Sequence, residues 1–380
     1  MEEVAIVGTG MIKFGSYPEK SVDELGAEAV ALVLQDSGVQ MKDIQALYAG
    51  NLMSTSGAGQ RILQQIGQTG IPAVNVANAC ATGSTAVREA YFAVASGAYD
   101  LVMAVGSEQL GKAGLLGAGR MDPATSPEGR IGTSLMPGVF AMAGMEHMRQ
   151  YGTDIKHFAK IAVKNHHHGT MNPLAQYQTE TPLEDVLNAR MVAYPNTLYM
   201  CCPTGDGAAA VILASAKKAR QYTSKPVRIL ASVLTSDPFT PRDLTLPDVN
   251  TLTKNAAKQA YEQAGIGPND LDLVELHDCF ATAELLHYEN LGLCGEGEAA
   301  KLIDDGETQI GGRIPVNASG GLLSKGHPLG ATGVANICEI VWHLRGDRKI
   351  TGGRQVEGAK VGLAHVIGLG SACTIHVLAT

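Results

Sequence analysis

Apolar positions along the chain define two stretches that read alike. Residues 27–47 place apolar side chains at helical spacing, then a glycine at Gly38, then the start of a short apolar strand. Residues 254–274 repeat this order around Gly265. A glycine there predicts a helix that ends in the left-handed conformation, because glycine adopts positive φ without steric cost. The pattern therefore predicts two copies of one helix–strand unit.

A second pair of matching stretches lies further along each copy. Ala-Thr-Gly at 81–83 precedes a helical run and then an apolar strand over 100–105. Ala-Thr-Gly at 331–333 precedes a helical run and then a strand over 360–364. Two matches in the same order argue against accident, so we expect two related α/β halves.

The first copy is interrupted by residues 111–200, which are rich in glycine, methionine and histidine. Within them, 140–151 has a helical pattern, and strand patterns are scarce. Such an insertion is typical of a lid or binding loop, and an oligomerisation arm is compatible with this. We expect a first half at 1–110 and 201–225, with this insertion between its parts, and a second half at 226–380.

Composition supports a layered α/β fold and excludes several functions. Of 380 residues, 45% are hydrophobic, 17% are charged and 45 are glycine, which suits closely packed elements around a large core. The net charge of −8 favours solubility and opposes a nucleic-acid partner. No secretory leader, membrane-length apolar run or peroxisomal signal is present in the sequence. Seven scattered cysteines favour free thiols, so we expect a cytoplasmic protein.

Cys80 is a candidate nucleophile. It lies among small residues in 76–84, directly before a predicted helix. The helix dipole and the unpaired N–H groups at a helix start favour a thiolate. Gly83 and Ser84 leave room for a substrate near the backbone. Local sequence alone supports a buried packing cysteine equally well.

The second half offers a base at the matching position. His327 lies in the glycine-rich segment 317–333, just before the helix that matches the one after Cys80. If the halves pack about a pseudo-twofold axis, the two helix starts converge, and His327 would activate the thiol. A histidine before a proline is more often an ordinary turn residue, but the matched position favours catalysis.

A further histidine and cysteine follow the predicted strand 273–276. His277 and Cys279 lie at the carboxyl end of that strand, where α/β folds place their chemistry. The alternative is that Asp278 caps a helix and that its two neighbours are incidental.

The segment 363–371 near the C-terminus follows the strand that mirrors 100–105, and it contains His365 and Gly368. Its glycine-rich backbone could donate N–H groups to an oxyanion. An ordinary tight turn between two core strands is the alternative.

Three other patterns are rejected as functional sites. The segment 4–10 resembles a dinucleotide-binding turn, but Lys13 stands where a third glycine is required. The histidines at 166–168 and the cysteines at 201–202 lack the spacing of a closed metal site, so we expect no metal. We expect the histidine run on a solvated face at a helix end, and Asp206 in a turn.

Together these motifs resemble the thiolase family over essentially the whole chain. The resemblance rests on Asn-Ala-Cys-Ala-Thr-Gly-Ser at 78–84, Gly-His-Pro-Leu-Gly-Ala-Thr-Gly at 326–333 and the duplicated halves. His-Asp-Cys-Phe at 277–280 resembles the sterol-carrier-type and archaeal-type members, whereas the best-known members have Asn-Glu-Ala-Phe. Those members also carry a cysteine near the terminal glycine-rich loop, where this chain has His365.

The resemblance implies a layered αβαβα core with a loop-domain insertion. It also implies a homodimer or dimer of dimers that uses CoA thioesters, with coenzyme A as co-substrate and no covalently bound cofactor. By resemblance, Cys80 is acylated, His327 is its base, and Cys279 is the second catalytic thiol. His277 and His327 would hold the enolate oxygen, and the Gly368 loop and the Cys80 N–H would hold the other oxyanion. The role of His365 stays open.

Two rival functions are weaker. A ketosynthase-like condensing enzyme that uses a carrier protein needs no base at Cys279. A non-catalytic acyl-CoA-binding subunit needs none of these four side chains. Some relatives of this subtype act beside a small zinc-ribbon and OB-fold protein, and such a partner is compatible with this chain.

Overall fold

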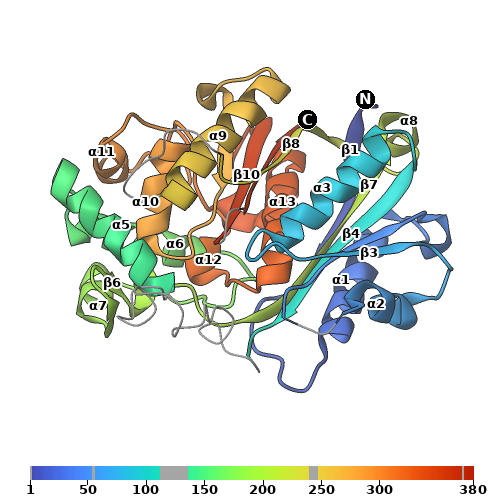
Figure 1. Ribbon diagram of the computed structural model, residues 1–380, viewed down its shortest axis with the longest axis horizontal. Helices are drawn as coiled ribbons and strands as arrows, with labels where there is room; N and C mark the ends of the chain where they lie inside the picture. The colour runs from blue at the N-terminus through green and yellow to red at the C-terminus, as the bar shows by residue number, and fades with distance from the viewer. Residues whose placement is uncertain (1, 54–55, 112–135, 239–246, 370–371) are drawn as a thin grey trace.

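A nine-stranded mixed sheet in the order β3-β2-β4-β7-β1-β8-β11-β10-β9 forms the centre of the protein (Figure 1). The computed structural model describes residues 2–53, 56–111, 136–238, 247–369 and 372–380. The strands of this sheet are β1 (Val4–Met11), β2 (Leu47–Gly50), β3 (Ala73–Val76), β4 (Leu101–Gln109), β7 (Asp206–Ser215), β8 (Val227–Thr235), β9 (Leu273–Glu275), β10 (Val361–Gly368) and β11 (Ala372–Ala379). A small separate sheet pairs β5 (Met191–Ala193) with β6 (Asn196–Thr197).

Helices cover both outer faces of this sheet and also lie between its halves (Figure 1). They are α1 (Val22–Ser37), α2 (Ala58–Ile66), α3 (Thr82–Ala95), α5 (Met136–Tyr151), α6 (Ile155–Thr170), α7 (Leu183–Asn188), α8 (Ala216–Ala219), α9 (Pro247–Ala264), α10 (Ala281–Asn290), α11 (Ala299–Asp304), α12 (Gly321–Ser324), α13 (Leu329–Arg345) and α14 (Arg348–Thr351). Short 3-10 turns are η1 (Met41–Asp43), η3 (Leu198–Met200), η4 (Pro268–Asp270) and η5 (Gly352–Arg354).

The sheet consists of two related halves that meet where β1 pairs with β8. On one side of that junction the order is β1, β7, β4, β2, with β3 added at the outer edge, and on the other it is β8, β11, β10, β9. Each half has a helix after its first strand, and both helices end at a glycine, Gly38 with φ 68° and Gly265 with φ 69°. The predicted duplication is therefore confirmed.

Helices α3 and α13 form the middle layer between the two half-sheets. Helices α1 and α2 cover the outer face of the first half, and α9 covers that of the second (Figure 1). The order of layers is αβαβα, as predicted. The starts of the two middle helices approach closely, because a Cβ on Gly83 would lie 2.3 Å from the Gly330 carbonyl oxygen. The segments just before these helices, which hold Cys80 and His327, are thereby brought together.

The described part of the predicted insertion contains α5, α6, α7, β5 and β6. The helix predicted over 140–151 is present as α5. Helix α6 packs against α10, α11 and α12 of the second half. Residues 112–135 of the insertion lie outside the described residues, and the division into segments at 111, 201 and 226 stays a prediction. Among the described helices, none is both long enough and apolar enough to cross a lipid bilayer.

Candidate active site

Cys80 lies at the tip of a tight turn between β3 and α3. Ala79 directly before it has φ 48°, in the left-handed region that a side chain with a Cβ rarely occupies. Such a conformation costs on the order of 1–3 kcal/mol, so the surrounding contacts must impose it. The Thr82 side chain supplies two of them, since its hydroxyl accepts from the Asn78 N–H at 2.8 Å and donates to the Ala79 carbonyl at 2.6 Å.

The end of β10 packs against this turn at Gly368. A Cβ at that position would lie 2.5 Å from the Asn78 carbonyl oxygen, so only glycine fits there. The strand runs to Gly368, and His365 is therefore a buried strand residue. The turn expected over 363–371 is shorter than predicted, and Gly370 and Ser371 lie outside the described residues.

His327 precedes α13, and its hydrogen bonds assign its tautomer. The Thr332 hydroxyl donates its single proton to the Pro328 carbonyl at 3.0 Å. It must therefore accept from His327 Nδ1, which lies 2.8 Å away. The proton of neutral His327 is thus on Nδ1, and Nε2 carries the lone pair that a general base needs.

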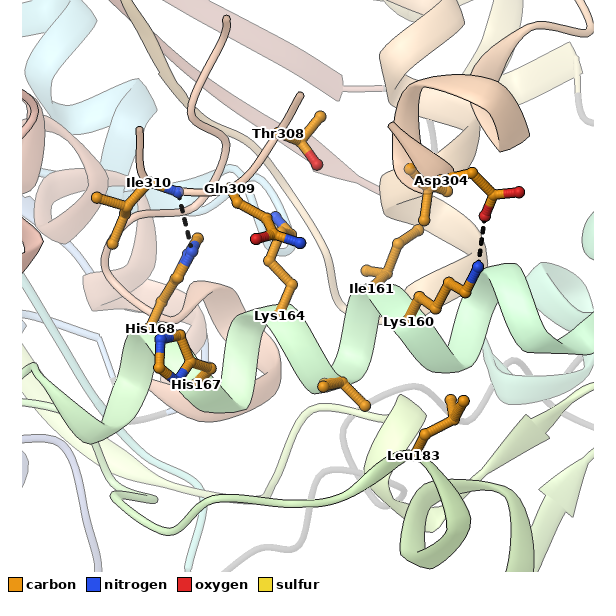
Figure 2. Close-up of a pocket in the computed structure, with 12 residues that line it drawn as sticks. Lys160, Ile161, Lys164, His167, His168, Leu183, Asp304, Thr308, Gln309 and Ile310 are labelled. Atoms are coloured by element: carbon orange, nitrogen blue, oxygen red, sulfur yellow. Dashed lines mark hydrogen bonds and ion pairs between the residues drawn. The ribbon is translucent and has the colours of Figure 1, made fainter. Parts of the chain in front are cut away.

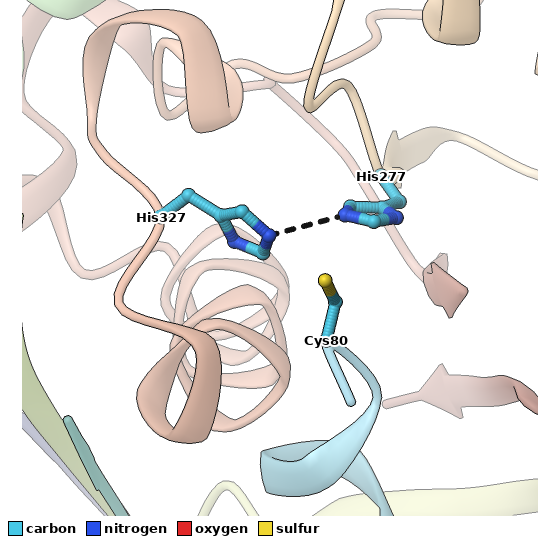
Figure 3. Close-up of side chains that lie close together, drawn as sticks. All are labelled: Cys80, His277 and His327. Carbon is cyan, nitrogen blue, oxygen red and sulfur yellow. Dashed lines mark hydrogen bonds between the residues drawn. The ribbon is translucent and has the colours of Figure 1, made fainter. Parts of the chain in front are cut away.

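His277 meets His327 from the loop after β9. The two Nε2 atoms are 3.3 Å apart, and because His327 Nε2 has the lone pair, His277 Nε2 donates (Figure 3). Cys80 Sγ and one ring nitrogen of each histidine all lie within 4.8 Å of one another. Three of the candidate residues, from three separate parts of the chain, are therefore brought together.

Burial sets the resting charges of this cluster. It raises the pKa of the Cys80 thiol to about 12, with the backbone N–H of Cys80 lowering it and Glu108 raising it further. Burial also lowers the pKa of His277 to about 3. The pKa of His327 falls well below its usual value through burial, with His277 and Lys325 adding to the effect. The resting pair is a neutral thiol beside a neutral imidazole, and the expected stabilisation of a thiolate by the helix start does not dominate.

A cavity of about 300 Å³ contains these groups and is mostly apolar in its lining. Cys279 lines it with Cys80, so both candidate thiols face one space. Burial raises the pKa of Cys279 well above its usual value, and the nearby thiols add to this. The other lining residues are His277, His327, Met136, Pro137, Phe140, Tyr177, Arg190, Val192, Leu198, Cys201, Cys202, Pro203, Thr204, Phe280 and Leu369.

His365 is not among the residues that line this cavity. It lies behind His277, whose backbone N–H is 3.5 Å from His365 Nδ1. The rings of His365 and His287 are 4.5 Å apart between centroids, and burial lowers the pKa of both. His365 Nε2 has no hydrogen-bond partner among the described residues.

A second cavity of about 430 Å³ lies along α6 (Figure 2). Cys80 is not among the residues that line it. The polar side chains of this cavity interact with other protein groups: Lys160 pairs with Asp304 at 2.6 Å, and His168 Nε2 accepts from the Ile310 N–H at 3.3 Å. Lys164 is held by Glu284 at 2.7 Å. Neither a cysteine nor a serine is among the residues that line it, so we place the chemistry at Cys80.

Two expectations about polar residues are wrong. His166 and His168 are buried on α6, and only His167 of that run is exposed. Tyr177 and Tyr199 of the insertion pack against the His166 ring. Ile310 and Asn317 of the second half contact the His168 ring. Asp206 is the buried first residue of β7, where its carboxylate accepts from the N–H groups of Tyr17 at 2.8 Å and Gly111 at 2.7 Å.

Comparison with known proteins shows the family to which this fold belongs. Family models for the thiolase N-terminal domain and the thiolase C-terminal domain-like region match residues 4–188 and 241–380. Sterol carrier protein 2 from Homo sapiens is 42% identical over 394 residues, which cover 99% of this chain and 71% of that protein. The chain belongs to the thiolase family.

Two further similarities support this thiolase assignment. An acetyl-CoA acetyltransferase from Methanothermobacter thermautotrophicus is 40% identical and covers 99% of both chains. A solved structure titled Ltp2-ChsH2(DUF35) aldolase has a TM-score of 0.82 at 26% identity, over 99% of this chain and 97% of that one. The thiolase is therefore an acyltransferase that acts on acyl-CoA, as predicted.

Sequence reasoning missed several residues that build the thiolase site. Asn317 has φ 54°, and its side chain accepts from the Leu276 N–H at 2.9 Å, which fixes the loop that carries His277. Asp278 does cap a helix, which was the alternative interpretation of this segment. The helix is α12, because the Asp278 carboxylate accepts from the Leu322 N–H at 2.7 Å. The sequence gives no sign of the positive φ at Asn317 except the residue type, since asparagine adopts this conformation more often than most residues.

Proposed function

We propose that this thiolase cleaves 3-ketoacyl-CoA with coenzyme A, or runs the reverse Claisen condensation, through an acyl-Cys80 intermediate. The observation that carries the proposal is the cluster of Cys80, His277 and His327 within 4.8 Å in a cavity that Cys279 also lines. A nucleophile, a base and a second proton donor around one apolar space are what acyl transfer with carbon–carbon bond cleavage requires.

The first step in the cleavage direction is attack by Cys80. His327 Nε2 takes the thiol proton, and Sγ bonds to the 3-keto carbon of the substrate. In the resting state His277 donates to that same Nε2, so the 3.3 Å contact must open before the proton moves. A substrate oxygen that accepts from His277 would open it, which couples nucleophile activation to substrate binding. The backbone N–H groups of Cys80 and the Gly368 loop hold the alkoxide that forms.

The second step breaks the bond between carbons 2 and 3. The electron pair stays with the acyl-CoA fragment as an enolate, and the acyl group remains on Cys80 as a thioester. His277 Nε2–H and the newly protonated His327 Nε2–H both donate to the enolate oxygen, each contributing roughly 3 kcal/mol in a dry site. The Cys279 thiol protonates carbon 2 and becomes a thiolate, which takes the proton of the incoming CoA thiol. The CoA sulfur then attacks the acyl carbon, and Cys80 Sγ leaves and recovers its proton from His327.

Cys279 favours this function over a ketosynthase-like enzyme fed by a carrier protein. Decarboxylative condensation makes its own carbanion and needs no thiol at that position. A non-catalytic acyl-CoA-binding subunit is disfavoured by the contact between His277 and His327, since paired imidazoles beside a thiol serve no purpose in simple binding. His365 is proposed as a supporting residue behind His277.

A panel of 3-ketoacyl-CoA thioesters tests the proposed function. Each thioester is incubated with the thiolase and free CoA, and loss of the enolate absorbance together with formation of two acyl-CoA products is followed. We expect cleavage of the 3-ketoacyl-CoA of at least one chain length. In a separate incubation without free CoA, we expect two acyl-CoA molecules to condense. Binding of every thioester with no cleavage and no Cys80 acylation would leave only the binding-subunit function.

The insertion should carry much of the CoA and acyl contact, because Phe140, Arg190 and Leu198 from its described part line the Cys80 cavity. We expect hydrogen exchange in 136–200 to slow when saturating CoA is added. Peptides from α1 and α2 on the far face of the first half serve as the internal control. Equal exchange throughout the insertion with and without CoA would contradict the proposed role.

We also propose a cytoplasmic homodimer or dimer of dimers, with a small zinc-ribbon and OB-fold protein as a partner. Seven free cysteines support a reducing compartment. The outermost strand β3 presents Val74 at 41% exposure, and an exposed apolar edge supports pairing with another chain. The partner is supported by the similar solved structure, whose title pairs Ltp2 with the DUF35 protein ChsH2.

A further inference from the structure

A buried ion pair joins the two segments that carry the histidines facing Cys80. Lys325 Nζ is 3.6 Å from Glu275 Oε2, and the exposed fractions of these side chains are 0% and 1%. Glu275 stands two residues before His277, and Lys325 stands two residues before His327. The ion pair therefore joins the same two loops that the imidazoles join through their 3.3 Å contact.

Both members of this pair are held in one geometry by further hydrogen bonds. Glu275 accepts from the Ser319 N–H at 2.9 Å and from the Ser319 hydroxyl at 2.6 Å. Lys325 donates to Asn336 Oδ1 at 3.0 Å, which anchors it to the middle of α13. A buried ion pair contributes little net stability compared with an apolar pair of similar size, so stability alone does not account for it.

The charges around His327 are few and come from three elements. Cys80 on the turn before α3 and His277 on the loop after β9 face its ring, and both rest in their neutral forms. Lys325 is the cation on its own loop. Two carboxylates lie near Lys325, Glu275 on β9 and Glu339 on α13. Glu339 also pairs with Arg354, and Arg354 in turn contacts His343.

We propose that Glu275 and Lys325 are positioning residues for the proposed base. Their ion pair fixes the spacing of the loops that carry His277 and His327, and the Lys325 ammonium opposes a second positive charge on His327. The imidazole therefore stays neutral and ready to accept the Cys80 proton, and it gives that proton up readily afterwards. This inference rests on the proposed roles of Cys80 and His327.

The test needs no identified substrate, because iodoacetamide reacts with the Cys80 thiolate and peptide mass spectrometry reports the rate at that residue. Three variants are compared with the natural protein across pH: Lys325→Met, Glu275→Gln and the neutral double variant. Lys325→Met removes the cation, so His327 binds a proton more tightly and more Cys80 thiolate forms at neutral pH. Each unit of pKa gained by His327 gives about a tenfold rise in thiolate.

We expect Lys325→Met to raise Cys80 alkylation at pH 7 several-fold and to move its acid limb to higher pH. Glu275→Gln breaks the same ion pair but removes the anion that offsets the cation, so its acid limb should move the opposite way, to lower pH. The double variant replaces one neutral pair by another and leaves no unpaired buried charge, so its acid limb should stay close to that of the natural protein. Equal profiles for Lys325→Met and Glu275→Gln, or a double variant displaced as far as Lys325→Met, would overturn the charge effect.

The spacing effect is measured separately by thiolysis of the panel thioester that the natural protein cleaves fastest. Both single variants should lower kcat by about 10-fold or more, because a displacement of about 1 Å in a catalytic group can cost 10²-fold. Unchanged kcat in both would overturn the positioning role. If the natural protein cleaves no thioester of the 3-ketoacyl-CoA panel, the proposed function fails, whereas the alkylation profiles still decide whether Lys325 controls His327.

Discussion

Replacement of Cys80 by alanine should abolish acyl transfer, with a loss in kcat on the order of 10⁴-fold or more. The Cys80 sulfur lies within 4.8 Å of a ring nitrogen of His277 and of one of His327, and His327 Nε2 carries a lone pair. Incubation of the natural protein with an acyl-CoA, followed by digestion and mass spectrometry, should place the acyl group on the peptide that contains Cys80. The variant should bind the acyl-CoA and remain unlabelled.

Cys202→Ala is the matched control for this prediction. Cys202 is buried and lines the same cavity, and its backbone N–H donates to the Cys279 carbonyl at 3.0 Å, which does not require the thiol. Its removal should leave acylation and turnover within a few-fold of the natural protein. An acyl label on Cys279 or Cys201 while the Cys80 peptide stays unmodified would reverse the assignment of the nucleophile.

The duplicated fold could be predicted because glycine residues mark the positions where the backbone needs a positive φ. Gly38 and Gly265 both stop a helix at positive φ, a conformation that other residues adopt only at a cost, so the repeat was visible without any alignment. The convergence of Cys80 and His327 followed from the same repeat, since each stands before a helix of the middle layer. A pseudo-twofold relation turns two local motifs into one site.

Burial and charge at the site could not be predicted in the same way. His166 and His168 look like a polar helix end, yet α6 is covered by elements that come more than a hundred residues later in the chain. The strained φ of Ala79 and the ion pair between Glu275 and Lys325 likewise depend on what packs against them. Local sequence therefore predicts the candidate reacting groups, and tertiary contacts determine their protonation.

Replacement of Cys279 by alanine should separate acylation from carbon–carbon bond chemistry. Cys80 and His327 are untouched by this change, so the variant should still become acylated. Thiolysis and condensation should fall by about 10²–10⁴-fold, the usual contribution of general acid–base catalysis. Burial raises the pKa of Cys279 well above its usual value, so it rests as a neutral thiol, the form that protonates an enolate. Exchange of the acetyl-CoA α-protons with deuterium from solvent, followed by NMR, reports this step alone.

The competing candidate for this proton transfer is His365, which stands where the best-known thiolases have a cysteine. It lies behind His277 and does not line the cavity, so it cannot reach carbon 2 of the substrate without displacement of His277. Cys279→Ala should therefore lose α-proton exchange, while Cys202→Ala keeps it and His365→Ala loses at most part of it. If Cys279→Ala keeps near-normal exchange and His365→Ala abolishes it, the proton is carried by His365 and Cys279 is a packing residue. Retained acylation of Cys80 in both variants would show that the loss arises at the carbon–carbon bond and not from a damaged nucleophile.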